Sequence, residues 1–586
     1  MKSYTLNTTG PQATMPPLTA ATKLLPLIQD EKRTLLLAFF AIFINAGLNL
    51  AGPVIVGHAI DTYIANGEYQ GVAISAAVLF VLYAIAFFAG VAQTKLMGGV
   101  GQRLLFNLRN AVFTKLQELP VAFFNQNKAG DLISRINSDT DKLNQFFSQS
   151  LMQLINNLFM IIGAAIAILI IKPQLGGAAL LPAVGLLIFS QAIGSWIRRK
   201  NAASLQATGG MSAEISESLN NFKVIVAFNR RDYFRRKFAQ ANDVNYQAAL
   251  RAGIANNVFI PIYGLSSDIA MLIVLVYGIY LITLGQFTIG LLISFLSYVT
   301  RFYDPLRQIA TIWASFQVAL AGWDRISAIL SLTSDMTTVA GIETKKNDAL
   351  LTFQNVHFRY SDGKEVLKGI DFTLEPGKTY ALVGPTGGGK TTTASLMARL
   401  YDPSEGTVLL EGKDIRSYSD SERTQKIGFI LQEPFLFTGS VRDNILYGNE
   451  QYEKLTNEQL LDVLVKANLD RLLERFENGL ETKILSSGDA ISLGQKQLIV
   501  FIRAVLRKPA LLVLDEATAN IDTVTEQLLE DILQKLPKET TKVIIAHRLN
   551  TIENADEIFF VNAGTIIRAG SMEHAVKMLL EGKRES

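Results

Sequence analysis

The feature that most constrains this chain is a series of long apolar segments within its first 310 residues. Each is about 20 residues long and carries few charges, which is the length that an α-helix needs to cross a bilayer. Soluble core helices are rarely so long and so uncharged. We therefore predict an all-α domain of six transmembrane helices, at residues 34–60, 71–93, 149–171, 176–197, 258–284 and 287–310.

The overall composition agrees with a membrane protein and excludes several other classes. Hydrophobic residues make up 49% of the 586 residues and charged residues only 18%. The net charge of +3 gives no reason to expect a nucleic-acid partner. The absence of Cys excludes disulfides and thiolate metal sites, and the 4 His are scattered, so any metal should be a hard ion bound by oxygen.

The distribution of Lys and Arg predicts the orientation in the membrane. These residues concentrate between the second and third apolar segments and between the fourth and fifth, whereas the alternate loops are short and nearly free of them. Positive residues stay on the cytoplasmic side. We therefore expect a multi-pass protein of the cell membrane with both termini and both long loops in the cytoplasm.

The two long loops are mostly helix-forming, and each should fold as a helical hairpin that extends below the membrane. The chain is expected to reverse near 125–130 and near 218–222. Each hairpin could be a solvated structural element or a lever that docks on a cytoplasmic domain.

A change in composition near residue 330 marks a domain boundary. We expect a flexible tail at 1–20, the membrane domain at 21–330, a linker at 331–348 and a second domain at 349–586. In this last part, short β-like segments alternate with amphipathic ones, as in an α/β domain with a largely parallel sheet. The tail lacks the apolar core of a signal peptide.

A phosphate-binding loop lies in the second domain, between the apolar strand 380–383 and a predicted helix. Its backbone N–H groups should wrap phosphates, with Lys390 reaching the β- and γ-phosphates and the Thr391 hydroxyl binding Mg²⁺. The predicted nucleotide-binding residues here are Gly384, Pro385, Thr386, Gly387, Gly388, Gly389, Lys390, Thr391 and Thr392.

Two adjacent carboxylates follow the apolar strand 511–514. Asp515 should hold Mg²⁺, and Glu516 should polarise the attacking water as general base. The alternative is an ordinary strand that ends in two solvated acids. The phosphate loop earlier in the chain favours the catalytic interpretation.

Between these motifs lies Ile491-Ser492-Leu493-Gly494-Gln495, which resembles the signature motif of ATP-binding cassette (ABC) proteins. Other landmarks follow the family's order: Tyr360 resembles the aromatic that stacks on adenine, and Gln432 the glutamine that senses Mg²⁺. Asp522 lies in a segment like the family's D-loop, and His547 resembles the switch histidine that contacts the γ-phosphate. The layout of six helices followed by one cassette is similar to a type IV half-exporter, and 130–135 resembles its first coupling loop.

This resemblance implies an ATPase, with ATP and Mg²⁺ as cofactors, that drives transport across a membrane. In the family, two cassettes face each other, and each ATP lies between one phosphate loop and the signature of the other chain. Ser492, Leu493, Gly494 and Gln495 should therefore contact ATP bound to a second half-transporter, and Glu516, His547, Lys390 and Gln432 should serve hydrolysis.

The signature departs from the family pattern at Leu493, where Gly is commonest, and 485–488 also differs from the usual sequence. In heterodimeric exporters, the subunit with the complete catalytic set often carries the altered signature. We therefore favour a heterodimer over a homodimer, although harmless variation at this position is the alternative.

Charged residues within the apolar segments suggest a transport pathway. Asp268 and Arg301 are candidates for substrate contact, with structural pairing as the alternative. The favoured function is export of amphipathic or hydrophobic compounds. Lipid flipping, an ATP-gated channel or regulator and type IV import are alternatives, whereas a soluble cassette acting on nucleic acid is excluded by the apolar segments.

Overall fold

The computed structural model describes residues 3–6, 25–339, 349–361, 363–485, 491–515, 523–545, 554–570, 573–574 and 577. The chain divides into two compact units. The helical unit comprises Thr8–Gln117 and Gly130–Ser331. The α/β unit comprises Met1–Asn7, Glu118–Ala129 and Leu332–Ser586. It therefore includes a short segment, Glu118–Ala129, that lies in sequence between the two parts of the helical unit.

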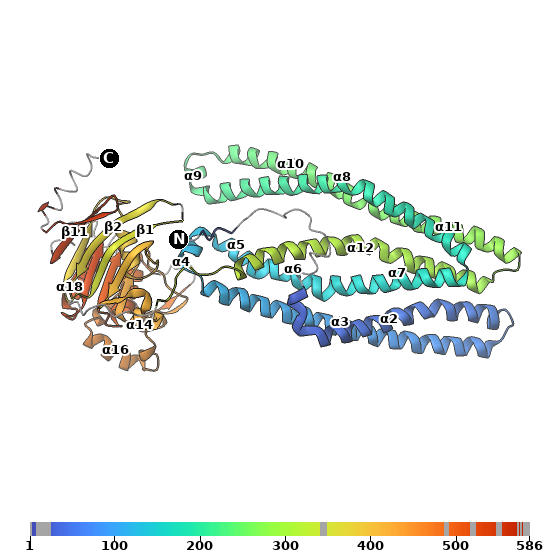
Figure 1. Ribbon diagram of the computed structural model, residues 1–586, viewed down its shortest axis with the longest axis horizontal. Helices are drawn as coiled ribbons and strands as arrows, with labels where there is room; N and C mark the ends of the chain where they lie inside the picture. Colours follow the sequence, from blue (N-terminus) through green and yellow to red (C-terminus); the bar gives the residue numbers. More distant parts are fainter. Residues whose placement is uncertain are drawn as a thin grey trace. The chain divides into compact units, whose positions relative to one another are not determined.

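Long helices that run side by side form the helical unit (Figure 1). They are α2 (Lys32–His58), α3 (Tyr69–Gln117), α7 (Leu151–Ile171), α8 (Pro173–Asn220), α10 (Arg231–Asn257), α11 (Phe259–Thr283) and α12 (Ile289–Leu330). Shorter helical segments are η1 (Leu25–Glu31), η2 (Ala59–Ile64), α5 (Ala129–Ser134), η3 (Arg135–Asp139), α6 (Thr140–Gln145), η4 (Phe146–Ser150) and α9 (Phe222–Ala227).

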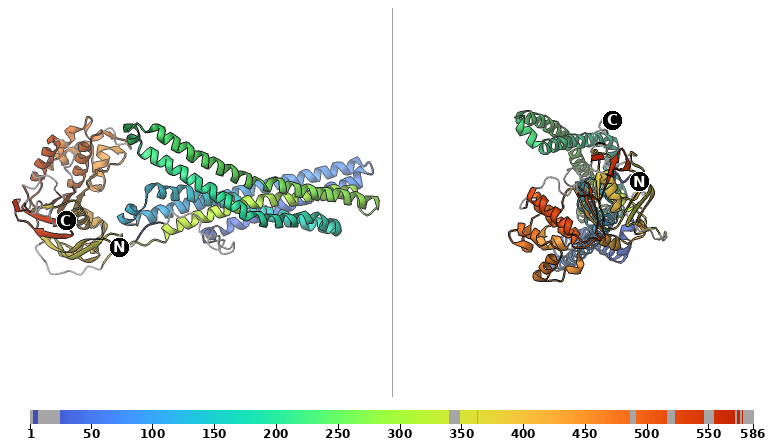
Figure 2. Two further views of the ribbon diagram at one scale, coloured as in Figure 1. Left: turned by 90° about the horizontal axis from the view of Figure 1, so that it is seen from above. Right: turned by 90° about the vertical axis from the view of Figure 1, so that its left-hand side faces the viewer.

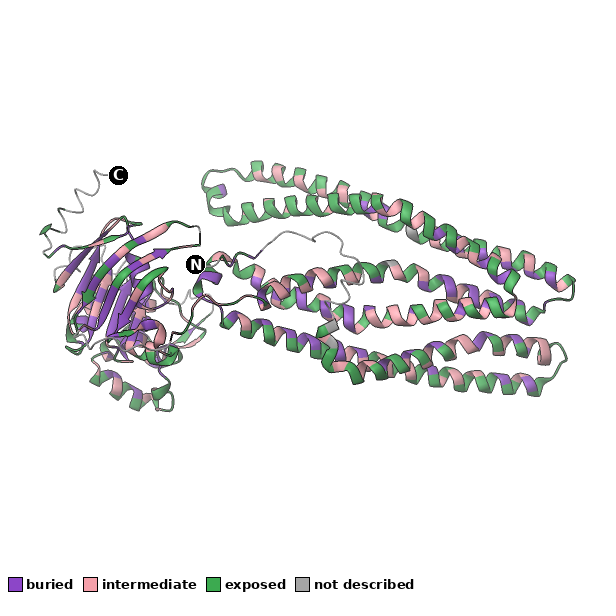
Figure 3. Ribbon diagram, in the orientation of Figure 1, coloured by how far each residue is buried: buried purple, intermediate pink, exposed green. Residues whose placement is uncertain are grey.

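Five helical stretches in the described part of the chain are long and apolar enough to cross a membrane: Gln29–Ile64, Tyr69–Gln117, Ala129–Ile171, Pro173–Asn220 and Arg231–Thr283. Between 6% and 28% of the most apolar window of each stretch is buried, so most of these residues are partly or fully exposed (Figure 3). So much exposed apolar surface requires lipid or a partner. The sixth predicted segment lies in α12, whose charged residues lower its hydropathy, and its membrane span stays a prediction.

In the structure, each of the two predicted hairpins consists of helices joined by short breaks. In the first, α4 (Val121–Gln126) ends before extended Asn127, and α5 begins at Ala129. In the second, α8 ends at Asn220, the short α9 follows, and α10 packs back along α8, which two further views also show (Figure 2).

Two glycines allow α2 and α12 to approach closely. A Cβ on Gly57 would lie 2.7 Å from the Gly290 carbonyl oxygen, and a Cβ on Gly290 would lie 2.1 Å from the Gly57 carbonyl oxygen. Next to this crossing, the Asp61 carboxylate accepts hydrogen bonds from the Thr288 hydroxyl (2.5 Å) and the Gly290 N–H (2.8 Å). This polar contact fixes the start of α12 against the end of α2.

Three sheets form the scaffold of the α/β unit. The six-stranded sheet has the order β12 (Thr565–Arg568), β11 (Glu557–Asn562), β3 (Thr379–Val383), β10 (Thr541–Ile545), β9 (Leu511–Asp515) and β6 (Ile427–Ile430). All neighbours in it are parallel except β11 and β12. The antiparallel sheet has the order β2 (Glu365–Leu374), β1 (Leu351–Arg359), β4 (Glu405–Leu410) and β5 (Lys413–Asp414). The small sheet pairs β7 (Gly439–Ser440) with β8 (Lys483–Ile484).

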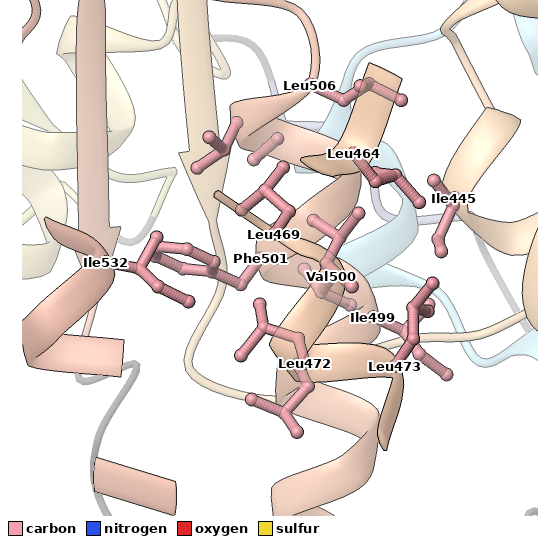
Figure 4. Packing of buried hydrophobic residues seen from close by; sticks show 14 of the residues in the cluster. Ile445, Leu464, Leu469, Leu472, Leu473, Ile499, Val500, Phe501, Leu506 and Ile532 are labelled. Atoms are coloured by element: carbon pink, nitrogen blue, oxygen red, sulfur yellow. The ribbon is translucent and has the colours of Figure 1, made fainter. Parts of the chain in front are cut away.

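Helices cover the parallel sheet and form an apolar cluster. The α-helices are α13 (Lys390–Met397), α14 (Asp420–Lys426), α15 (Val441–Leu446), α16 (Asn457–Lys466), α17 (Leu493–Val505) and α18 (Thr523–Lys535). Helix α17 lies at the centre of this cluster, where Ile499 and Phe501 pack with Leu464, Leu472 and Ile532 (Figure 4). The cluster buries most of α17, which fixes the direction of its N-terminus.

The predicted fold class, a helical membrane domain followed by an α/β domain, is therefore confirmed.

Candidate functional site

The candidate site lies where the central parallel strands end. In the register of the sheet, Ile545 of β10 pairs with Leu382 of β3 and with Asp515 of β9, and Ile430 of β6 pairs with Leu514. Parallel strands that end in register send their following loops to one edge. The phosphate loop, Asp515 and Gln432 therefore come from the same edge of the sheet.

The phosphate loop connects β3 directly to α13, as the sequence predicts. Lys390 is the first residue of α13 and is 5% exposed. Its Nζ donates to the carbonyl oxygens of Gly384 (2.9 Å) and Pro385 (3.0 Å), so the ammonium group lies across the loop. This charge and the helix N-terminus make the loop suitable for binding phosphate.

Gly384 is required by the tight path of the loop. Its φ is +148°, and a Cβ there would lie 2.0 Å from the Val561 carbonyl oxygen of β11. Gly387 also has a positive φ, +81°, but no heavy atom lies within 4 Å of its Cβ position. Both glycines therefore have an unusual backbone conformation, but only Gly384 lacks room for a Cβ atom.

We predict that Gly384→Ala weakens ATP binding and destabilises the α/β unit by on the order of 3 kcal/mol, because the loop must shift and accept strain. Gly387→Ala is the matched control, with only the conformational cost of about 1–2 kcal/mol. Thermal unfolding and nucleotide titration measure both effects. Equal effects of the two substitutions would contradict the packing argument.

An oxygen-rich corner lies beside the loop. The Thr391 hydroxyl donates to Asp515 Oδ1 across 3.4 Å, and Asp515, the last residue of β9, is 2% exposed. A hydroxyl and a carboxylate fit Mg²⁺, which usually takes one or two protein oxygens together with substrate phosphates and water. Gln432 is exposed and follows β6 at the same edge. No cluster of His, Cys, Asp and Glu suited to a metal occurs among the described residues.

Aromatic residues lie beside the phosphate-loop helix. Tyr360 follows β1, and its hydroxyl shares a hydrogen bond with the Thr392 hydroxyl (3.0 Å). Tyr401 meets the Tyr360 ring edge-on at 5.7 Å between centroids. Burial raises the pKa of Tyr401, which keeps its hydroxyl protonated. The predicted adenine-stacking residue is thus tied directly to the nucleotide loop.

The signature segment forms the N-terminus of α17. The Ser492 hydroxyl accepts from the Gln495 N–H (3.2 Å), while Gln495 Oε1 accepts from the Ser492 N–H (2.8 Å). This capping box leaves the Ser492 hydroxyl hydrogen able to donate elsewhere. Gln495 Nε2 also donates to the Arg475 carbonyl oxygen (2.6 Å). Leu493 is 43% exposed, and Gly494 is buried.

Several predicted residues lie outside the described part of the chain. They are the general base Glu516, the D-loop residue Asp522 and the switch histidine His547. Their predicted roles therefore stay predictions. Glu516 directly follows Asp515, and His547 comes two residues after Ile545.

The two candidate pathway residues lie on neighbouring helices. Asp268 is exposed on α11, and Arg301 is half-buried on α12. Helices α11 and α12 pack together. Among the described residues, no hydrogen-bond or ion-pair partner is found for the Asp268 carboxylate.

The structure also shows a charged network that sequence reasoning missed. Arg135, 1% exposed, donates to Asp131 Oδ2 (2.8 Å) and to the Arg325 carbonyl oxygen (2.8 Å). Arg325 bonds Asp131 Oδ1 (2.5 Å) and lies 3.3 Å from Asp139, which Lys142 also contacts (2.8 Å). Asp131 and Arg135 were noted as part of a coupling-loop motif, but nothing in the sequence indicated their partner in α12.

Comparison with known families assigns both units. Residues 35–306 match the model of the ABC transporter transmembrane region, and 367–519 match the ABC transporter model. The chain is 31% identical to an uncharacterized ABC transporter ATP-binding protein, YfiC, of Bacillus subtilis, over 94% of this chain and 91% of that protein. This chain belongs to the ABC transporter family.

Two further relatives carry more specific descriptions. A fatty acid ABC transporter ATP-binding/permease protein of Mycobacterium tuberculosis is 31% identical, over 86% of this chain and 79% of its own length. A probable multidrug resistance ABC transporter ATP-binding/permease protein, YheH, of Bacillus subtilis is 30% identical, over 88% of this chain and 76% of its own length.

The predicted family membership is confirmed. The protein is an exporter-type ABC half-transporter, a multi-pass membrane protein whose ATP-binding domain makes it an ATPase coupled to transport.

Proposed function

We propose that this chain exports amphipathic or hydrophobic compounds by ATP-driven alternating access, with both termini in the cytoplasm. The proposal rests on two features that occur in the same chain. One is a phosphate loop beside Asp515, and the other is a helical unit with exposed apolar faces. The relatives described as fatty acid and multidrug resistance transporters support an apolar cargo.

We assign the chemistry of ATP hydrolysis to the edge of the parallel sheet. Lys390 and the loop N–H groups bind the phosphates, and Tyr360 stacks on the adenine. Thr391, Asp515 and Gln432 would hold Mg²⁺, which would neutralise phosphate charge. Glu516 orients and deprotonates the attacking water, and His547 contacts the γ-phosphate. Asp522, the predicted D-loop residue, is proposed to face the second cassette.

The second chain supplies what this ATP site lacks. Ser492 caps α17, and the buried body of this helix fixes the direction of its N-terminus. A helix N-terminus can bind an anion. We propose that Ser492, Leu493, Gly494 and Gln495 contact ATP bound to the partner. ATP then closes the two cassettes, hydrolysis releases them, and the coupling turns transmit the motion to the membrane helices.

We favour a heterodimer because the exposed Leu493 places an apolar side chain at the end of α17 that should face the partner's nucleotide. Native mass spectrometry of the chain purified from its own membranes tests this. Copurification with a different half-transporter supports the asymmetric arrangement. A stable homodimer whose ATPase activity responds to cargo would contradict it.

Asp268 is proposed as a pathway residue, with Arg301 as its neighbour on α12. A carboxylate at membrane depth is costly, and this one has no partner among the residues that the structure describes. We predict that Asp268→Asn changes the transport of cationic amphiphiles about tenfold or more, the loss of one charge interaction of about 1.4 kcal/mol. The control is Asp304→Asn, which removes an exposed carboxylate on α12. If Asp268→Asn leaves the transport of every tested compound unchanged, Asp268 is not part of the pathway.

ATPase stimulation tests the class of cargo. In lipid nanodiscs, amphipathic compounds should raise the ATPase rate, whereas hydrophilic sugars and amino acids should not. Lipid flipping is the second candidate, since one relative is described as a fatty acid transporter. ATP-dependent movement of labelled lipid between leaflets, with no stimulation by soluble amphiphiles, would favour flipping over export.

The proposed domain limits are 21–330 for the membrane domain and 349–586 for the nucleotide-binding domain, joined by a linker at 331–348. The division into two compact units is consistent with a boundary close to Ser331, and it assigns the turn 118–129 to the α/β unit.

A further inference from the structure

Residues Ser3–Leu6 pack within the α/β unit. The sequence predicts a flexible tail at 1–20, but within it Tyr4 and Leu6 are buried. Tyr4 is 1% exposed and Leu6 is 7% exposed. Such burial of two apolar side chains in a four-residue segment gives it a specific docking site and not a random path.

The segment binds the end of α4 through its backbone. The Tyr4 N–H donates to Gln126 Oε1 (2.7 Å), and the Leu6 N–H donates to Asn127 Oδ1 (3.0 Å). Asn127 Nδ2 in turn donates to the Tyr4 carbonyl oxygen (2.9 Å). Two amide side chains of the turn therefore satisfy three backbone groups of the tail, which fixes the register of the segment.

The Tyr4 side chain binds a third segment, the start of the linker. Its ring meets the Phe123 ring of α4 edge-on, with centroids 6.3 Å apart. Its hydroxyl donates to Asp335 Oδ1 (2.7 Å) and accepts from the Asp335 N–H (2.8 Å). Burial raises the pKa of Tyr4 to about 12, so the hydroxyl remains a donor at cellular pH.

The same turn contacts the nucleotide-binding core directly. Asn125 Nδ2 donates to the Tyr401 hydroxyl (2.7 Å), and the Tyr401 ring packs against Tyr360. Helix α4 is thus attached to the core by Asn125 and to the linker through Tyr4. Without the tail, the second attachment would lose the hydroxyl and backbone bonds described above.

We propose that Ser3–Leu6 form an N-terminal clamp that seats α4 against the linker, with Tyr4 as its positioning residue. The coupling role of the clamp rests on the proposed transport function. Helix α4 lies in the turn between α3 and α5, so it is continuous with the membrane helices on both sides. A clamp that holds this turn in the α/β unit prevents the turn from sliding. Motions of the cassette are then transmitted to the membrane helices.

The first experiment compares Tyr4→Ala, Tyr4→Phe and the control Ser3→Ala in the full-length protein with its partner. Ser3 is exposed and, among the described residues, bonds only Thr5, so Ser3→Ala should have no effect. We expect Tyr4→Ala to lower the ratio of cargo transported to ATP hydrolysed about threefold or more, with the KM for ATP and the basal ATPase rate unchanged. Tyr4→Phe, which keeps the ring and loses the Asp335 bonds, should have an intermediate ratio.

A lower amount of folded protein with an unchanged ratio would indicate a merely structural contact and overturn the coupling role. A wild-type ratio in Tyr4→Ala would overturn it as well. Recovery toward the wild-type ratio in Tyr4→Phe supports the ring contact with Phe123 as part of the clamp.

The second experiment tests the clamp without reference to transport. The chain has no Cys, so a Thr5→Cys and Gln126→Cys pair reports only its own proximity; the side-chain oxygens of these residues lie 3.4 Å apart. Because Cys is shorter than Gln, the pair is joined with a short bifunctional thiol reagent. We expect cross-linking in membranes with and without ATP, and faster amide hydrogen exchange at 121–127 in Tyr4→Ala. Failure to cross-link, or unchanged exchange, would overturn the clamp. Cross-linking in a protein that transports nothing would instead refute the proposed function and leave the clamp standing.

Discussion

Replacing Lys390 with Ala is expected to lower the rate of ATP hydrolysis about 100-fold to 1,000-fold, the usual effect of removing one charged group that stabilises the transition state. Lys390 is buried at the start of α13, and its ammonium group spans the loop by bonds to Gly384 and Pro385. Its loss removes both the charge for the phosphates and an internal support of the loop. The measurement is phosphate release by the purified transporter at saturating ATP.

Lys378→Ala is the matched control. Lys378 lies at the other end of β3, where it pairs with Glu375 across 2.7 Å and is partly exposed. Exposed ion pairs contribute less than about 1 kcal/mol, so this substitution should leave hydrolysis within about twofold of the wild-type rate. Retention of rapid hydrolysis by Lys390→Ala would refute the assignment of the nucleotide site.

Asp131→Ala is expected to destabilise the helical unit by about 3–5 kcal/mol, because it removes the carboxylate that neutralises the buried Arg135. For a unit of this size, the melting temperature should fall by on the order of 10 °C. Asp131 also binds Arg325 near the end of α12, so the connection between α5 and α12 should loosen. We further expect transport to fall more than basal hydrolysis does.

Two controls separate charge burial from simple loss of a carboxylate. Asp232→Ala removes an exposed partner of Arg235 on α10 and should cost less than about 1 kcal/mol. The double variant Asp131→Leu, Arg135→Met removes both charges and should recover most of the stability. A double variant as unstable as Asp131→Ala would show that the network does not act through charge neutralisation.

The sequence was sufficient to predict the elements with strong local signals. The strand before the phosphate loop, the helix after it, and Asp515 at the end of a buried strand all follow from short patterns with a direct physical reason. The long apolar segments likewise predicted five helical stretches that are long and apolar enough to cross a membrane. Helix α12, which carries Arg301, Asp304 and Arg307, is not among them.

Contacts between distant segments could not be predicted in this way. Tyr4 and Asp335 lie 331 residues apart, Arg135 and Arg325 lie 190 residues apart, and no periodicity links either pair. The π-helical turns η3 and η4 also escaped prediction, because their residues have ordinary helical propensities. Sequence patterns specify elements, whereas these pairings depend on how the elements pack.

The N-terminal segment is the clearest example of this limit. Its polar and Pro-rich composition indicated a tail, and composition carries no information about a docking site made by Phe123, Gln126, Asn127 and Asp335. Short segments are ordered by the surface that receives them.

Accumulation of cargo in inside-out membrane vesicles tests the central claim, that the chain is half of an ATP-driven exporter. We predict that a fluorescent amphiphile accumulates above its external concentration when ATP is added, and that Lys390→Ala or a non-hydrolysable ATP analogue prevents this. Entry that stops at the external concentration would indicate a channel, and accumulation that is unchanged in Lys390→Ala would contradict ATP-driven export by this chain.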